Sequence, residues 1–283
     1  MMYPHTETMV TFNDAISIEV ILLISIVIAI LSPLVPNSKL RYYTCYICYI
    51  AVLAVVPLSL APIIIIRPKN VYNLRLIGNI TRHFTKIIGI KWELRNGKIL
   101  REKQGAIIAA NHQSLFDTMG MFNIWDVMDK CAPIAKKEIL YAIPFGPIAW
   151  LSGVVFIDRE KRALAINNLK SAAKVLKKKR SKLWIFPEGT RNKEAKSTLP
   201  FKNGAFRTAI ESQVPIIPLV YSPYSFIDSK NKTFSKGKII MSVLEPISTE
   251  GLTIDDLEPL KERVHKLMSD EYQRLKEETA MSQ

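Results

Sequence analysis

"AIIAANHQSLFD", residues 106–117, joins a short apolar run to a polar turn. Its first five residues are continuously apolar, which is typical of a strand buried on both faces of a parallel sheet. The turn holds His112, and Asp117 follows five positions later. Ligands of open α/β sheets bind outside the carboxyl ends of the strands. The stretch therefore predicts an α/β fold with a site at the end of this strand.

The chain beyond residue 66 repeats this alternation of apolar runs and amphipathic segments, which is the pattern of one α/β domain. Further apolar runs predict strands at 153–158, 182–187, 214–222 and 238–246. Apolar residues at helical spacing predict helices at 161–179, at 203–212 and from Leu257 to Leu275.

Two apolar segments precede the domain, at residues 20–31 and 42–66. The second runs 25 residues without a charge, long enough for a helix to span about 30 Å of hydrocarbon. Pro57 and Pro62 predict that it kinks, ends early or forms one arm of a shallow hairpin. No Lys or Arg precedes the first segment, which favours a retained anchor over a cleaved signal peptide. We predict membrane-anchoring helices in residues 1–70 and leave the number of spans open.

A third uncharged run covers residues 139–157, but two prolines and two glycines interrupt it. It predicts a folded loop, a short helix and a strand at a membrane surface.

Charge divides the chain at about the same place. The formal net charge is +14, yet residues 1–66 hold three acidic and two basic side chains, which leaves +15 for residues 67–283. In a chain with membrane segments, this excess favours anionic lipid headgroups or phosphorylated substrates over nucleic acid. The three cysteines indicate no disulfide framework, and the CxxC pair Cys45 and Cys48 lies in an apolar segment without neighbouring His or Asp, which argues against a zinc or redox role.

His112 and Asp117 lie about 140° apart if both belong to one continuous helix, so they cannot meet there. They can meet if His112 lies in the turn and Asp117 in the first turn of the following helix, where the dipole favours a carboxylate. Such a pair suits a general base, and the alternative is a histidine that only caps and packs. The sequence has no GxSxG motif, which argues against a serine hydrolase. Its histidines do not have the spacing of metal ligands, which argues against a metal site.

"FPEGTR", residues 186–191, is a second polar cluster at the end of a predicted strand. Gly189 allows backbone amides to face outward, and Thr190 and Arg191 add donors, so the turn can bind an anion. The alternative is a bare turn with a surface arginine. "DR", residues 158–159, follows another strand and is either part of the same site or a structural ion pair.

"NHQSLFD", "GVVFIDR", "FPEGTR" and "VPIIPL" resemble, in this order, the four motifs of the glycerolipid acyltransferases of the 1-acyl-sn-glycerol-3-phosphate type. The resemblance runs from about Ile107 to Leu219 and is closest to the eukaryotic lysophosphatidate branch. It implies an α/β fold with a mixed sheet flanked by helices, preceded by N-terminal hydrophobic membrane helices. Residues 71–283 would form the acyltransferase domain.

The resemblance also implies roles for single residues. His112 matches the catalytic base, Asp117 the carboxylate that orients it, and Pro215 a motif associated with structure or acyl binding. The remaining matches imply substrate binding, mainly to the phosphate of the acceptor, by Lys136, Arg159, Glu188, Gly189, Thr190 and Arg191.

The activity implied is acyl transfer from acyl-CoA to the sn-2 hydroxyl of 1-acyl-sn-glycerol-3-phosphate, giving phosphatidic acid. We expect no cofactor and no metal, since acyl-CoA is a co-substrate, and we expect the endoplasmic reticulum membrane as the location. Another glycerol phosphate, a lysophospholipid acceptor or a noncatalytic lipid-binding role are the alternatives. The sequence leaves the acyl-chain preference and the oligomeric state open.

Overall fold

The computed structural model describes residues 39–158, 178, 180–192, 194 and 196–281. The apolar segment 20–31, Arg159 and all of the helix expected at 161–179 except Lys178 lie outside the described residues. Seven strands form one sheet, in the order β1-β9-β6-β2-β5-β3-β4. They are β1 (Ile90–Arg95), β2 (Ala106–Ala110), β3 (Cys131–Lys136), β4 (Val155–Ile157), β5 (Lys182–Ile185), β6 (Ile216–Tyr221) and β9 (Gly237–Val243).

The sheet is mixed, which confirms the expected fold class. β2 lies parallel to β5 and β6, with Ile107 beside Leu183 and Ile216. β3 continues the parallel part, whereas β9 runs antiparallel to β6 and parallel to β1. The carboxyl ends of β2, β5 and β3 therefore meet at one edge of the sheet, where the loops with the predicted site residues begin. All five predicted strands are present.

β1 and β3 were not predicted from sequence. β1 is an edge strand that carries charged residues, "IKWELR", and only its first residue is fully buried. β3 contains Pro133 and becomes exposed towards Lys136. Neither strand has the continuous apolar run by which the buried strands were recognised.

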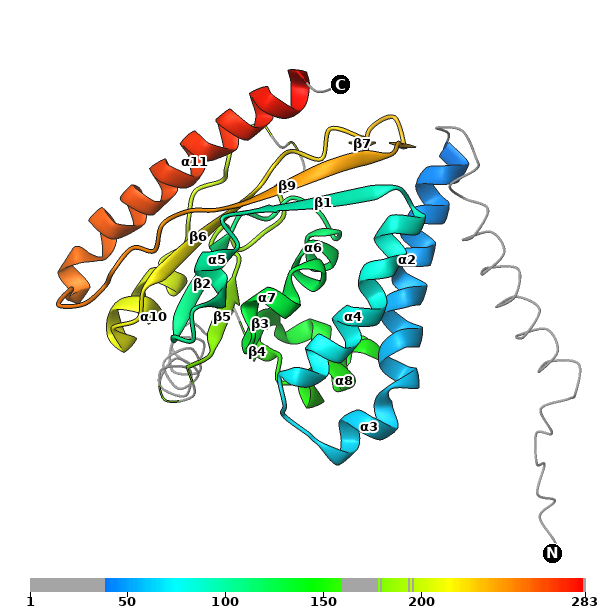
Figure 1. The fold of residues 1–283 in the computed structure, drawn as a ribbon, viewed down its shortest axis with the longest axis horizontal. Helices are drawn as coiled ribbons and strands as arrows, with labels where there is room; N and C mark the ends of the chain where they lie inside the picture. The colour runs from blue at the N-terminus through cyan, green and yellow to red at the C-terminus, as the bar shows by residue number, and fades with distance from the viewer. Residues whose placement is uncertain (1–38, 159–177, 179, 193, 195, 282–283) are drawn as a thin grey trace, which may run out of the picture.

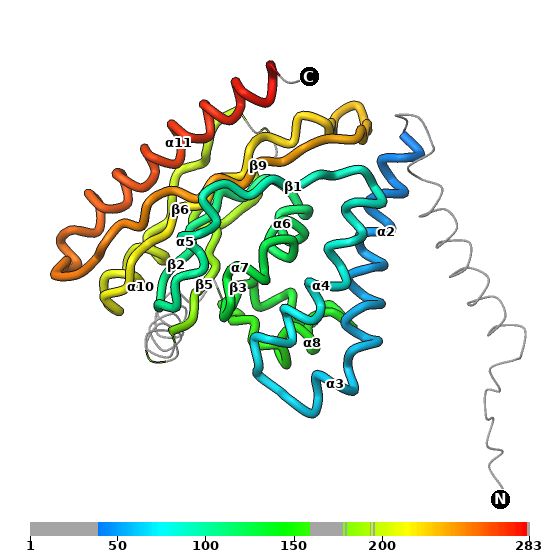
Figure 2. Tube along the Cα trace, in the orientation of Figure 1, coloured from blue at the N-terminus to red at the C-terminus, as the bar shows by residue number. Residues whose placement is uncertain are grey.

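Helices cover both faces of the sheet in three layers (Figure 1). α10 (Gly204–Ser212) and α11 (Leu257–Met281) pack on one face, where Ile107 and Ala109 of β2 point. On the other face, Ala106, Ile108 and Ala110 meet a second group of helices. These are α2 (Lys39–Ser59), α4 (Tyr72–Ile87), α6 (Asp117–Asn123), α7 (Trp125–Met128) and α8 (Phe145–Leu151), with α4 between α2 and α6 (Figure 2).

Short elements complete the described chain. They are α3 (Ala61–Ile66), α5 (Lys98–Arg101), the 3-10 turns η2 (Lys137–Tyr141) and η3 (Ile254–Asp256), and the hairpin strands β7 (Ile227–Asp228) and β8 (Thr233–Phe234). The uncharged run 139–157 folds as η2, α8 and β4, so the prediction of a loop, a short helix and a strand is confirmed.

The second apolar segment does not form one unbroken helix. α2 ends at Ser59, just after Pro57, and Pro62 lies in the first turn of α3. By length and composition α2 could cross a membrane. One side of it packs on the domain and buries Tyr42 and Tyr49. The outward side of α2 and α3 exposes a row of large apolar residues, Leu40, Tyr43, Ile47, Ile50, Val55, Leu58, Ile63, Ile65 and Ile66. The outward surface of these helices therefore suits contact with lipid.

Candidate active site

The loop after β2 is held by side-chain hydrogen bonds that continue the sheet. Asn111 Nδ2 donates to the Tyr221 carbonyl at 3.1 Å, and Asn111 Oδ1 accepts from the Tyr221 amide at 2.7 Å. Gln113 Nε2 donates to the Ser222 carbonyl at 3.1 Å, and Gln113 Oε1 accepts from the Tyr272 hydroxyl at 3.1 Å. The residues on either side of His112 are thus tied to the end of β6 and to α11.

His112 and Asp117 meet as the sequence predicts. Asp117 is fully buried in the first turn of α6, and its Oδ2 lies 2.6 Å from His112 Nδ1. The same oxygen accepts from the amides of Gln113 at 2.7 Å and Ser114 at 3.0 Å. Because a carboxylate only accepts, Nδ1 is the donor of this hydrogen bond, and the tautomer of the neutral imidazole that forms it has its lone pair on Nε2. The His112 side chain is 22% exposed.

The other carboxylate oxygen of Asp117 has its own donor. The Tyr224 hydroxyl donates to Oδ1 at 2.7 Å, and the Tyr221 hydroxyl donates to the Asp117 carbonyl at 3.1 Å. Burial and the charge of Asp117 hold the pKa of Tyr224 well above its usual value. The Tyr224 hydroxyl therefore stays protonated and donates. Tyr224 was not predicted as a site residue, because it lies after the fourth motif and belongs to no recognisable motif itself.

The loop after β5 supports His112 from a third side. The Phe186 ring stacks on the imidazole, with centroids 4.1 Å apart and planes 17° apart. Glu188 Oε1 accepts from the His112 amide at 3.0 Å, and the Asn192 amide donates to the His112 carbonyl at 2.7 Å. Glu188 is 2% exposed. The structure thus places Glu188 against the His112 main chain and away from solvent, where it positions the histidine.

A cavity of about 290 Å³ lies beside the His112–Asp117 pair. Its wall contains two cations, Arg191 and Lys232, and no carboxylate among the residues that line it. The full lining is Tyr42, Tyr46, Gln113, Ser114, Leu115, Arg191, Asn192, Tyr224, Ile227, Ser229 and Lys232. The histidine–carboxylate pair therefore lies next to a space suited to an anion.

Comparison with known proteins gives one consistent answer. The acyltransferase family model matches residues 91–222, from β1 through the end of β6. The human protein 1-acyl-sn-glycerol-3-phosphate acyltransferase alpha is 39% identical over 73% of this chain and 72% of its own length. A 1-acyl-sn-glycerol-3-phosphate acyltransferase of Haemophilus influenzae is 33% identical over 76% of this chain and 88% of its own. The chain belongs to the 1-acyl-sn-glycerol-3-phosphate acyltransferase family.

The fold agrees with that membership. The crystal structure of the 1-acyl-sn-glycerophosphate acyltransferase PlsC from Thermotoga maritima superposes with a TM-score of 0.60. It covers 72% of this chain and 80% of that one at 24% identity, which shows a common fold.

Of the remaining residues in the family's third motif, Gly189 has a conformational reason. Its φ is +70°, and a Cβ there would lie 2.9 Å from Lys202 Cδ. Its amide donates to the Phe186 carbonyl at 3.1 Å, so this turn is closed by its own backbone. Thr190 and Arg191 are exposed, and Arg191 reaches the cavity. The structure thus brings His112, Asp117, Glu188 and Arg191 together.

Other matched residues lie further away. Lys136 is exposed at the carboxyl end of β3, two strands from β2 at the same edge of the sheet. Asp158 follows β4, and its Oδ2 lies 3.4 Å from Lys137 Nζ. Arg159, the predicted acceptor contact, lies outside the described residues.

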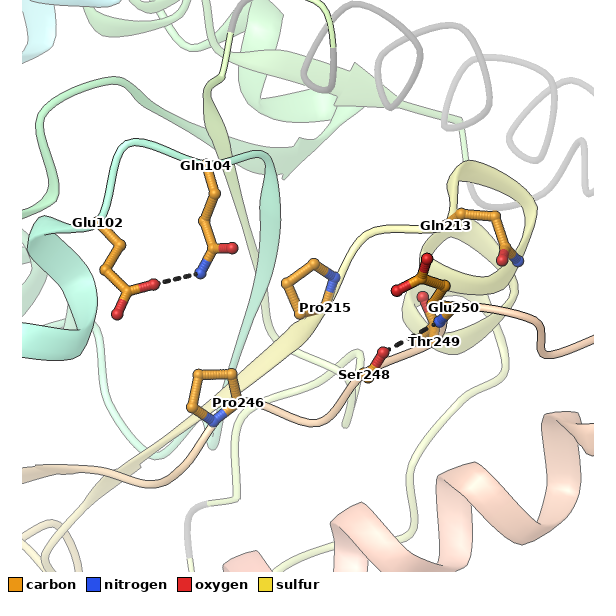
Figure 3. Close-up of a pocket in the computed structure, with 8 residues that line it drawn as sticks. All are labelled: Glu102, Gln104, Gln213, Pro215, Pro246, Ser248, Thr249 and Glu250. Atoms are coloured by element: carbon orange, nitrogen blue, oxygen red, sulfur yellow. Dashed lines mark hydrogen bonds between the residues drawn. The ribbon is translucent and has the colours of Figure 1, made fainter.

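Pro215 lies at the opposite edge of the sheet, just before β6, where its carbonyl accepts from the Ile107 amide at 2.9 Å. It borders an open hollow of about 810 Å³ at the amino ends of β2 and β6 (Figure 3). The lining of that hollow includes Glu102 and Glu250 and no Lys or Arg, so it does not suit a phosphate. The position of Pro215 fits a structural role for the fourth motif better than contact with a chain bound beside His112.

Glu188→Gln should change how stability depends on pH. Burial raises the pKa of Glu188 from 4.5 to about 7, although the His112 amide favours the charged form. A raised pKa favours folding below about pH 4.5, and this contribution is lost as the pH rises through 7, by at most roughly 3 kcal/mol. The Tm of Glu188→Gln minus that of the unaltered protein should therefore grow between pH 5 and pH 8. A constant difference across that range would contradict the prediction.

Tyr224→Phe should lower kcat about tenfold, equivalent to ~1.4 kcal/mol of transition-state stabilisation, and leave both KM values within about threefold. The change removes one donor from Asp117 Oδ1 and keeps the aromatic packing against Trp92 and Phe226. Steady-state assays would measure it. Tyr43→Phe, on the outward side of α2, is the control and should behave as the unaltered protein. Equal activity of the two variants would rule out a role for the Tyr224 hydroxyl.

Proposed function

We propose that this chain transfers an acyl group from acyl-CoA to the sn-2 hydroxyl of 1-acyl-sn-glycerol-3-phosphate, giving phosphatidic acid. The observation that carries the proposal is the His112–Asp117 pair, 2.6 Å apart, beside a cavity with two cations in a chain of this family. A lipid-binding protein without activity has no need of a base beside an anion site.

His112 is the proposed general base. Nε2 takes the proton of the acceptor hydroxyl while its oxygen attacks the thioester carbonyl, and the C–S bond breaks as the intermediate collapses. The imidazolium then protonates the leaving thiolate of coenzyme A. Asp117, whose Oδ2 lies 2.6 Å from Nδ1, stabilises the imidazolium and holds the ring with Nε2 on the side away from the carboxylate. General base catalysis of this kind contributes about 10²- to 10⁴-fold in rate.

The proposed reaction uses no cofactor and no covalent enzyme intermediate, because the thioester is already activated. Phe186 and Glu188 hold the imidazole in place through stacking and the main-chain hydrogen bond. Arg191 is the proposed contact to the acceptor phosphate, since a guanidinium can take two phosphate oxygens at once. Thr190, Lys136 and Arg159 remain proposed substrate contacts on the strength of their motif positions.

The membrane supplies and receives the lipids. α2 links the apolar surface to the cavity. Together with α3 it exposes the outward apolar residues, and its Tyr42 and Tyr46 line the cavity. An acyl chain that stays in lipid avoids about 0.8 kcal/mol of transfer cost per CH₂. We propose the endoplasmic reticulum membrane, because the human relative is nearer in sequence than the bacterial one. Fluorescence microscopy of the tagged chain tests the location.

An acceptor panel tests the activity. The purified chain in detergent is given one acyl-CoA with 1-acyl-sn-glycerol-3-phosphate, glycerol 3-phosphate, dihydroxyacetone phosphate or lysophosphatidylcholine. We expect the highest kcat/KM with 1-acyl-sn-glycerol-3-phosphate. A higher value for another acceptor would reassign the substrate. Folded protein that acylates none of the four would support the noncatalytic lipid-binding alternative.

A further inference from the structure

The cavity beside His112 is closed by an element that belongs to none of the four motifs. The β7–β8 hairpin, residues 227–234, lies against the amino-terminal part of α2 (Figure 1). It contributes Ile227, Ser229 and Lys232 to the wall of the cavity that Arg191 of the third motif also lines. The family model ends at residue 222, so the hairpin lies beyond the matched segment.

The turn of the hairpin has a defined geometry. Asp228 Oδ1 accepts from the amides of Lys230 at 2.8 Å and Asn231 at 3.0 Å, and Asp228 Oδ2 accepts from Asn231 Nδ2 at 2.6 Å. Lys232 follows with a φ of +56°. This turn directs Lys232 towards α2, where its Nζ lies 5.4 Å from the centre of the Tyr42 ring. Lys230, two residues earlier, is exposed and does not line the cavity.

Side-chain hydrogen bonds fasten the hairpin to α2. Arg41 Nε donates to the Phe234 carbonyl at 2.7 Å, and the Tyr42 hydroxyl donates to Ser229 Oγ at 3.4 Å. Arg41 also donates from Nη2 to the Ile88 carbonyl at 2.8 Å, just after α4. The position of Lys232 over the cavity is therefore set by tertiary contacts.

The charges of the cavity are unbalanced. In the described part of the chain, neither Arg191 nor Lys232 forms an ion pair with a carboxylate, although both side chains line the same space. Three residues with hydroxyl groups, Tyr42, Tyr46 and Ser229, also line the cavity. Two cations that face one cavity repel each other, and a bound anion relieves that repulsion. A phosphate monoester carries about −1.5 to −2 near pH 7, which matches two cations better than a phosphodiester does.

The cavity is lined by direct neighbours of the His112–Asp117 pair. Ser114 lines it and donates its amide to Asp117 Oδ2 at 3.0 Å, and Asn192 lines it and donates its amide to the His112 carbonyl at 2.7 Å. In glycerol 3-phosphate only a few bonds separate the phosphate from the sn-2 hydroxyl, so an acceptor whose phosphate binds in the cavity can bring that hydroxyl to His112.

We propose that Lys232 binds the phosphate monoester of the acceptor together with Arg191, so that the β7–β8 hairpin selects monoester over diester acceptors. The inference rests on the proposed function and adds to it a binding residue and a source of headgroup selectivity. A phosphate group of coenzyme A can also bind these two cations. Separate KM values for the acceptor and for acyl-CoA show which of the two substrates supplies the bound phosphate.

The test compares Lys232→Gln with Lys230→Gln, which removes an equal charge from the same turn. We expect Lys232→Gln to raise the KM for 1-acyl-sn-glycerol-3-phosphate about 10- to 100-fold, with kcat and the KM for acyl-CoA within about threefold. Its preference for that acceptor over lysophosphatidylcholine should fall in proportion. Lys230→Gln should leave all these values unchanged, and Lys232→Arg should stay within about threefold.

Three results would overturn the inference. They are equal effects of Lys232→Gln and Lys230→Gln, an unchanged acceptor KM in Lys232→Gln, and a rise in the KM for acyl-CoA alone, which would assign the cavity to the donor.

A binding measurement separates this inference from the proposed function. Glycerol 3-phosphate should raise the Tm of the unaltered protein and of Lys230→Gln, and should not raise that of Lys232→Gln. If the unaltered protein acylates no acceptor, the proposed function fails, yet this Tm difference would still support a phosphate site. If the protein is active and the Tm shift is equal in all three, the inference alone fails.

Discussion

His112→Ala is expected to lower kcat for acyl transfer to 1-acyl-sn-glycerol-3-phosphate by about 10²- to 10⁴-fold. The substitution removes the lone pair of Nε2 and leaves the acceptor hydroxyl without a base. Both KM values should stay within about threefold, because proton transfer belongs to the transition state and the cavity walls are unchanged. Steady-state assays with the purified variant measure this result.

The fold should survive the same substitution. Glu188 and Asn192 hold residue 112 by its main-chain amide and carbonyl, and these two hydrogen bonds persist in alanine. His83→Ala is the control, since His83 is an exposed residue of α4. It should match the unaltered protein in activity and Tm. Purified His112→Ala with ordinary kcat would end the general-base assignment.

Asp117→Asn should produce a loss of similar size, about 10²- to 10⁴-fold in kcat. The three donors around Oδ2 favour the amide oxygen at that place, so the Nδ1–H bond of His112 can persist. The negative charge that stabilises the imidazolium is lost, and the amide nitrogen introduced by the substitution must face the Tyr224 hydroxyl. The loss should therefore appear in kcat, with acceptor binding through the cavity retained.

A double variant separates a role through His112 from a merely structural one. Asp117 has nothing to orient once residue 112 is alanine, so adding Asp117→Asn to His112→Ala should lower the residual rate by less than about threefold. Multiplied losses would mean that the two residues act independently. Circular dichroism and Tm of the three variants check that the fold is kept.

Much of the fold could be read from local pattern. β2, β5 and β6 are short apolar runs, and α11 has a clear apolar stripe. A strand buried on both faces is apolar at every position, and an amphipathic helix is apolar at helical spacing, so both can be recognised from residues that are close in sequence. β1 and β3 could not be read in this way. Their burial depends on neighbours in the sheet order β1-β9 and β5-β3, which no local pattern records.

The site divides in the same manner. The pairing of His112 with Asp117 follows from five residues of turn and helix start, so the sequence predicts it correctly. Glu188 was predicted to contact substrate, whereas its carboxylate accepts from the His112 amide and is buried behind it. That position arises because β5 lies beside β2 in the sheet, which brings the ends of two distant segments together.

The amino-acid sequence by itself determined the α/β class, the family and the pairing of His112 with Asp117, because each is set by neighbouring residues or by a motif. Only the tertiary structure decided which distant side chains complete the site. Tyr224 reaches Asp117 across 107 residues, and Lys232 reaches the same cavity as Arg191 because the hairpin packs on α2. Such contacts depend on strand order and on helix packing over the sheet, and these are properties of the whole folded chain.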